Sequence, residues 1–288
     1  MTRDDLVAGA YEAIAQGSKS FRMASQLFDR TTRERAWLLY CWCRHCDDVC
    51  DGQTLGHRTG AAPTGDVRAL TRRAVAGETV DELPFDALAA LLAECPIPER
   101  YLFDHLEGFA LDTEGWRPND TGDLLRYCYH VAGAVGCMMA IVMGVDRHDE
   151  ETLRRASDLG IAFQLSNIAR DVADDHETGR CYLPEAWLAE AGLTRAGLLR
   201  EENRDALVAL VARVCDLADF YEASARDGVA RLPFRSRWAV LSAAGIYGRI
   251  GRRVAALGPG AWDRRVVVRK REKAAIMIGA LGRAAAAA

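Results

Sequence analysis

The sequence predicts a single all-α domain that spans residues 1–288. Apolar residues recur at three- and four-residue spacing through most of the chain, which is the period of an amphipathic helix. Alternating runs of β-branched residues bounded by turns, the pattern of strands, do not stand out. No linker is long enough to separate two domains, and half of the residues are hydrophobic, enough for one large core.

The helical pattern divides into successive segments separated by glycine, proline and polar clusters. The expected helices span residues 4–16, 30–50, 66–76, 84–93, 97–112, 121–143, 149–176, 203–228, 235–257 and 270–284. Residues 52–65 are expected to form a loop, and Asp120 and Thr121 are suited to cap the helix that follows them. Residues 1–16 and 284–288 are the ends expected to fray.

The most apolar stretch, Val131 to Val145, has 15 residues, whereas a membrane-spanning helix needs roughly 20. We therefore expect a buried core helix and no transmembrane segment. The acidic start of the chain, with Asp4 and Asp5, is unlike a signal peptide, so the expected location is the cytoplasm. The net charge of −4 gives no global reason to bind nucleic acid, although a local basic patch is compatible with it.

Four of the nine cysteines crowd into one helix, at Cys41, Cys43, Cys46 and Cys50. A single straight helix cannot surround a zinc ion with four thiolates, so we expect these thiols to serve as small packing residues.

Two predicted helices carry matching stripes of polar and acidic residues. The first stripe contains Tyr40, Arg44, Asp47 and Asp51, with Asp48 at its edge. The second contains Gln164, Asn167, Asp171 and Asp175, with Asp174 at its edge and Arg170 beside it. Within each stripe the spacing places every member on one face of a helix.

Acidic side chains stacked along a helix repel one another, and burying them costs far more unless a cation neutralises them. Carboxylate and amide oxygens without histidine or thiolate partners suit Mg²⁺, with Mn²⁺ as a possible substitute. Two such stripes that face each other would hold a diphosphate through bridging metal ions. The alternatives are a solvated acidic face and a di-iron centre, for which the expected Glu-x-x-His pairs are missing.

Five stretches in order resemble the squalene/phytoene synthase family. They are Tyr40–Asp51 and Gln164–Asp175, which resemble its two aspartate-rich motifs, together with Gly17–Phe21, Tyr127–Gly136 and Gly179–Pro184. The resemblance covers positions 17 to about 265. It implies the all-α isoprenoid-synthase fold with a central cavity.

The resemblance also implies roles for individual residues. Metal ligands would be Asp47, Asp51, Asn167, Asp171 and Asp175. Catalysis would involve these four aspartates together with Arg44, Arg170 and Tyr127. Substrate contacts would come from Ser18, Lys19, Ser20, Phe21, Tyr40, Arg44, Gln164, Asn167, Arg170, Tyr247 and Arg265.

The implied reaction joins two geranylgeranyl diphosphates head to head through a cyclopropyl intermediate to give phytoene, a step of carotenoid biosynthesis. Tyr127, Tyr129 and the released diphosphate all remain open as the proton acceptor. The runner-up is a dehydrosqualene or squalene synthase that uses farnesyl diphosphate, and the non-enzymatic alternative is a scaffold homologue. We expect no NADPH, since no glycine-rich dinucleotide turn is present. The expected partners are prenyl diphosphates, a peripheral membrane surface and later carotenoid enzymes that receive the product.

Overall fold

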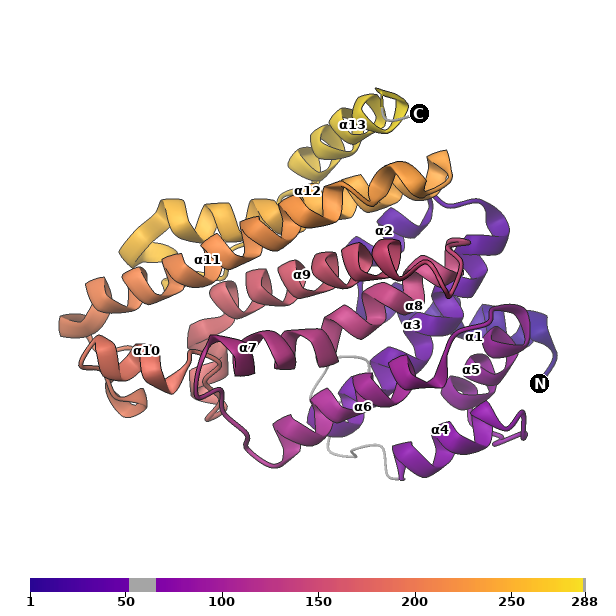
Figure 1. Ribbon diagram of the computed structural model, residues 1–288, viewed down its shortest axis with the longest axis horizontal. Coiled ribbons are helices and arrows are strands. Elements are labelled where there is room, and N and C mark those ends of the chain that lie inside the picture. The colour runs from indigo at the N-terminus through magenta and orange to yellow at the C-terminus, as the bar shows by residue number, and fades with distance from the viewer. Residues whose placement is uncertain (52–65, 287–288) are drawn as a thin grey trace.

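The computed structural model describes residues 1–51 and 66–286, and every regular element in these ranges is helical (Figure 1). The first half contains α1 (Arg3–Gly17), α2 (Lys19–Ser25), α3 (Arg30–Asp51), α4 (Val67–Val75), α5 (Leu83–Glu94), α6 (Glu99–Thr113), α7 (Thr121–Cys128) and α8 (Ala134–Val142). The second half contains α9 (Glu150–Glu177), α10 (Glu185–Glu190), α11 (Arg204–Arg226), α12 (Phe234–Leu257) and α13 (Lys270–Ala286). The all-α prediction is confirmed.

Short helical turns of other types join some of these elements. They are the π-helical turn η1 (Tyr129–Gly133) and the 3₁₀ turns η2 (Arg195–Gly197), η3 (Glu201–Asn203), η4 (Val229–Arg231) and η5 (Gly258–Trp262). The turn η1 divides the helix expected over residues 121–143 into α7 and α8. The expected loop 52–65 lies outside the described residues.

Two helices, α2 and α10, were not predicted because each is too short to show a hydrophobic period. Helix α2 begins where the side chain of Ser18 accepts a hydrogen bond from the backbone N–H of Phe21 at 3.2 Å. Helix α1, at the end expected to fray, starts with a capping box in which Thr2 and Asp5 bond to each other's backbone N–H groups. Its Leu6, Ala10 and Ile14 are buried, so α1 is a packed element.

Helix α9 is the central helix of the molecule, with α7 and α8 along one side and α11 and α12 along the other (Figure 1). Helices α8 and α9 pack with their backbones almost touching. A Cβ atom at Gly136 would lie 2.2 Å from the carbonyl oxygen of Ala156, and one at Gly160 would lie 2.2 Å from that of Ala132. Only glycine permits this approach at either position.

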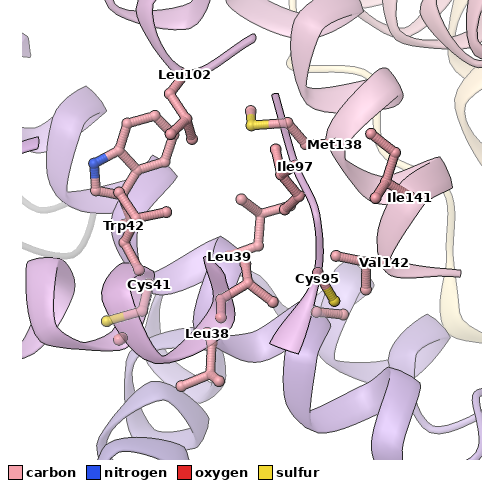
Figure 2. Packing of buried hydrophobic residues seen from close by; sticks show 14 of the residues in the cluster. Leu38, Leu39, Cys41, Trp42, Cys95, Ile97, Leu102, Met138, Ile141 and Val142 are labelled. Atoms are coloured by element: carbon pink, nitrogen blue, oxygen red, sulfur yellow. The ribbon is translucent and has the colours of Figure 1, made fainter. Parts of the chain in front are cut away.

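A second body of core lies where α3 meets α6 and α8. Figure 2 shows Trp42 of α3 beside Leu102 of α6, with Leu39 of α3 and Met138 of α8 in the same buried cluster. The indole nitrogen of Trp42 donates to the hydroxyl of Thr71 at 3.2 Å. This packing holds α3, which carries the first acidic stripe, in place relative to α8 and α9.

Helices α7 and α8 with η1 form a run, Thr121–Val142, that is long and apolar enough to cross a membrane by length and composition. This run is longer than the apolar stretch Val131 to Val145 measured in the sequence, because it also includes α7 and the first residues of η1. Half of the apolar window is buried against other helices of the fold. It packs as the core helix that the sequence predicted.

All nine cysteines are free thiols. Cys41 and Cys46 are buried, and burial raises the pKa of the Cys41 thiol to about 12. In residues 1–51 and 66–286 no group of three or more His, Cys, Asp or Glu side chains is placed to hold a metal ion. Cys41 and Cys46 belong to the buried core around α3, as expected of packing residues.

Candidate active site

A cavity of about 500 Å³ lies between α2, α3, α8, α9 and α12. Its lining is mostly apolar. Along α9 the lining residues follow one face of the helix, at Thr152, Arg155, Ala156, Leu159, Gly160, Phe163, Gln164 and Asn167. Small residues of η1 and α8, namely Ala132, Gly136 and Ala140, also line it. This stretch therefore leaves room for a ligand and also packs closely on α9.

Most of the polar lining residues gather at the end of the cavity where α9 presents Asn167. They are Ser18, Tyr40, Arg44, Asp47, Asp112, Tyr127, Gln164, Asn167 and Tyr247. Eight of these nine residues, all except Asp112, were predicted from the motifs as site residues, and Phe21 is a ninth predicted residue in the lining. The structure therefore brings residues of both stripes to one cavity. The opposite end, formed around Thr152, Arg155 and Val229, is apolar apart from these two side chains of α9.

On α3, Arg44 holds the acids of the first stripe. Its guanidinium lies 2.8 Å from a carboxylate oxygen of Asp47 and 2.6 Å from one of Asp48. Asp48, which the sequence placed at the edge of the stripe, is buried, whereas Asp47 is half-exposed and faces the cavity. A buried carboxylate needs such a charged partner, so Arg44 fixes Asp48 and leaves Asp47 toward the ligand space.

On α9, the acids of the second stripe lie beyond the polar end of the cavity. Arg170 pairs with the carboxylate of Asp171, which is the next residue. Arg265, from the segment before α13, donates to Asp171 at 3.0 Å and to Asp174 at 2.8 Å. The structure therefore brings Arg265 to this stripe from 94 positions away. Asp171 itself does not line the cavity.

Asp175 occupies a separate, small pocket with Arg180, Cys181, Tyr182 and Leu183. Burial raises the pKa of its carboxyl to about 7, and the neighbouring charge of Asp171 adds to the effect while Arg180 opposes it. Two carboxylates, Asp171 and Asp175, thus lie one helical turn apart with one of them largely desolvated. Such a pair is stabilised by any cation that binds between them.

A tyrosine pair stands beside this acidic end. The hydroxyls of Tyr127 and Tyr182 donate to the two carboxylate oxygens of Asp112, each at 2.8 Å. The rings of Tyr127 and Tyr182 stack at 4.8 Å, and Trp116 stacks on the other face of Tyr127 at 5.7 Å. Burial raises the pKa of Tyr127 well above its usual value, so its hydroxyl stays protonated and donates. Tyr129, by contrast, bonds to Asp104 and is not a lining residue.

The other predicted substrate contacts from α2 and α12 also lie at this end. Phe21 packs against Tyr40 at 5.6 Å between ring centroids, and Tyr247 stacks on Phe163 at 4.2 Å. A Cβ atom at Gly17, the last residue of α1, would lie 2.4 Å from the Tyr40 hydroxyl, so a larger residue there would displace the Tyr40 side chain. The side chains of Lys19, Ser20 and Asp51 lie outside the described part of the structure.

Sequence reasoning missed several residues of this cavity. Asp112 lies at the end of a predicted helix, and no spacing connects it with Tyr127 and Tyr182. His105 lines the cavity, is buried, and has an Nε2 atom without a hydrogen-bond partner. Arg155 lines the far end. A periodicity count places His105 and Arg155 on core-facing sides of α6 and α9, but it cannot say that those sides face a cavity.

The residues at and just beyond the polar end fit a hard divalent cation by their chemistry, since Asp47, Asp171 and Asp175 offer carboxylate oxygens and Asn167 an amide oxygen. Asp171 and Asp175 follow on successive turns of α9 beyond Asn167, the last residue of α9 that lines the cavity. With arginines on both helices, the arrangement can surround a strongly anionic group and leave an apolar chamber behind it. Fold and site together define the class of an all-α synthase that handles an anionic head and a long apolar tail.

The chain belongs to the squalene/phytoene synthase family, whose sequence profile matches residues 14–272. It is 46% identical over 291 aligned residues to a 15-cis-phytoene synthase of Pantoea ananas, covering 99% of this chain and 94% of that one. It is 45% identical to a 15-cis-phytoene synthase of a Paracoccus strain, covering 96% of this chain and 90% of that one.

Solved structures agree with the fold. A crystal structure of a dehydrosqualene synthase with a ligand matches with a TM-score of 0.86 at 25% identity, covering 99% of this chain and 98% of that one. A squalene synthase of Alicyclobacillus acidocaldarius matches with a TM-score of 0.73 at 25% identity, covering 88% of this chain and 95% of that one. The predicted isoprenoid-synthase fold is thereby confirmed.

Proposed function

We propose that this protein is a phytoene synthase that condenses two geranylgeranyl diphosphates head to head in a magnesium-dependent reaction. The observation that carries the proposal is identity of 45–46% over nearly the whole chain to phytoene synthases. The dehydrosqualene synthase of similar fold is only 25% identical. A scaffold role is disfavoured, because a non-catalytic homologue is expected to have lost its metal-binding carboxylates. Here Asp47, Asp171 and Asp175 are all present.

The length of the cavity supports a C20 substrate. From Asn167 to Thr152 the lining follows α9 for 15 residues, roughly 22 Å of helix. An extended C20 prenyl tail is about 20 Å long and a C15 tail about 15 Å, from carbon–carbon bonds of about 1.5 Å. A C20 tail with its diphosphate at Asn167 would therefore reach the apolar far end.

In the proposed site, Asp47, Asp51, Asn167, Asp171 and Asp175 would hold Mg²⁺ (or Mn²⁺), which neutralises the leaving diphosphate as its charge grows. Arg44, Arg170 and Arg265 each pair with an acid of the stripes, which places their guanidinium groups beside the proposed metal ligands. There they would add positive charge around the leaving diphosphate. The apolar lining excludes water that would quench an allylic cation. Tyr127, held by Asp112, is positioned at the boundary between the anionic end and the chamber.

The proposal includes a cytoplasmic location, a reaction without NADPH, and release of the product to later enzymes of carotenoid synthesis. The products decide between the candidates. Purified protein is incubated with Mg²⁺ and either the C15 or the C20 diphosphate, with and without NADPH. We expect phytoene from the C20 substrate regardless of NADPH. A C30 product formed preferentially would establish the runner-up instead.

Two carboxylate variants test the site within the same assay. Asp47→Ala and Asp171→Ala should each lower turnover at least about 100-fold while the helical circular dichroism signal stays at the wild-type level. Glu177→Ala is the matched control, since Glu177 is an exposed acid further along α9. Full activity in either stripe variant would refute the clamp even if phytoene is made.

A further inference from the structure

The charge of the chain is divided very unevenly along its length. Residues 228–286 contain thirteen Lys and Arg against two acids, Asp263 and Glu272, for a net charge of +11. Because the whole chain has a net charge of −4, the remaining residues carry −15. The overall acidity thus conceals a basic C-terminal part made of η4, α12, η5 and α13.

Helix α13 lies at the edge of the molecule, outside α12 (Figure 1). Its inner side is fixed, because the Trp238 indole donates to the carbonyl oxygen of Met277 at 2.8 Å and Arg237 donates to that of Ala284 at 2.9 Å. Ala280 and Ala284 are fully buried on that side. The helix is therefore a packed part of the fold with one side left to the surroundings.

The outer side of α13 is apolar after its first residues. A single stripe with helical spacing is exposed, made of Arg271, Ala274, Ala275, Ile278, Leu281, Gly282 and Ala285. Ile278 is 72% exposed and Leu281 is 38% exposed, and Val267, just before the helix, is 60% exposed. Large apolar side chains left in water along one helix face indicate a contact surface.

Cations surround this apolar stripe. Lys270 and Arg271 stand at its start and Arg283 near its end, all exposed. In the described ranges, 1–51 and 66–286, none of these three forms an ion pair with an acid. A helix with an exposed apolar face and unneutralised cations around it matches the chemistry of an anionic lipid surface, where charge attracts and apolar groups insert.

We propose that the outer face of α13, defined by Arg271, Ala274, Ala275, Ile278, Leu281, Gly282 and Ala285, rests on an anionic membrane surface. This goes beyond the proposed function, and it gives that function a route for oily molecules. Arg237 also donates to the carbonyl oxygens of Ala230 and Leu232, so the same guanidinium joins the end of α13 to the segment around η4. Val229 and Leu232 of that segment line the far end of the cavity. The lipid-facing surface and the end of the tail chamber therefore adjoin.

The test is flotation of the full-length protein with vesicles of phosphatidylcholine, with or without phosphatidylglycerol. We expect binding to the phosphatidylglycerol vesicles that weakens as salt rises. Ile278→Glu with Leu281→Glu, and separately Lys270→Glu with Arg271→Glu, should each reduce binding at least about tenfold, since each cation near such a surface contributes roughly a fivefold change. Phe220→Glu on α11, where Phe220 is 67% exposed, is the control and should bind like wild type.

Two readouts keep the result interpretable. All variants should retain wild-type circular dichroism and unchanged product formation in detergent, because no substituted residue lines the cavity. Wild-type protein that never floats, or α13 variants that float equally well, would overturn the proposal. So would a dimer in light scattering that the Ile278 and Leu281 variant converts to monomer, because the apolar face would then bind a second copy of the chain.

Discussion

At the scale of single residues, the site depends on charges that compensate one another away from water. The buried carboxylate of Asp48 is neutralised by two hydrogen bonds from Arg44. The carboxylate of Asp112 accepts hydrogen bonds from two tyrosine hydroxyls. These pairs orient Asp47 and Tyr127, which face the ligand space. Asp112 could not be predicted from the sequence, because its partners come from positions 15 and 70 residues away.

His105 is the buried residue with the clearest pH consequence. Burial lowers the pKa of its imidazole to about 4, whereas the unfolded value is 6.5. The unfolded chain therefore binds more protons between these values, so stability is complete above pH 6.5 and is lost as the pH falls toward 4. We predict that wild type loses roughly 2 kcal/mol of unfolding free energy between pH 7 and pH 5 through this residue.

Urea denaturation at both pH values measures the effect. His105→Leu removes the titrating group, so the loss between pH 7 and pH 5 should shrink by that amount even though the variant is less stable overall. An unchanged pH dependence in His105→Leu would show that other groups govern acid destabilisation.

At the scale of helices, the acidic stripes could be predicted because helical spacing alone places their members on one face. The split of the 121–143 helix by η1 could not be predicted, since the pattern is apolar on both sides of it, and α2 could not because it is too short to show a hydrophobic period. The close approach of α8 and α9 belongs to this scale. Gly136 meets the backbone of Ala156 directly, and backbone atoms cannot move aside as a side chain can.

Gly136→Ala should therefore push α8 away from α9 and destabilise the protein by about 3 kcal/mol or more, with loss of activity, since both helices line the cavity. Gly282→Ala in α13 is the matched control, because a Cβ there meets nothing within 4 Å. It should be neutral or stabilising by up to about 1 kcal/mol, the helix propensity difference. Equal thermal melting of Gly136→Ala and wild type would contradict the packing described here.

At the scale of the whole molecule, the fold class followed from periodicity, but the depth of the cavity did not. The far end is closed by Arg155, whose guanidinium donates to Ser224 at 2.6 Å and lies 3.4 Å from Asp227. Gly228 allows this placement, since a Cβ there would lie 2.7 Å from the Cβ of Arg155. No pattern in the sequence joins position 155 with the end of α11.

Arg155→Ala should lengthen the chamber. We predict that the ratio of kcat/KM for a C25 diphosphate to that for the C20 substrate rises at least about tenfold, because differences of a few buried carbons change specificity by that order. Competition assays with both substrates measure the ratio directly. A general loss of activity with an unchanged ratio would mean that Arg155 only supports the structure.

The central claim is that α3 and α9 hold a metal-bridged diphosphate at the polar end of the cavity. The most direct measurement is a crystal structure with Mn²⁺ and a non-reactive geranylgeranyl diphosphate analogue, in which anomalous scattering locates the metal. We predict Mn²⁺ between Asp47 on α3 and Asp171 and Asp175 on α9, with the tail running toward Arg155. Metal bound elsewhere, or a diphosphate at the Arg155 end, would contradict the account.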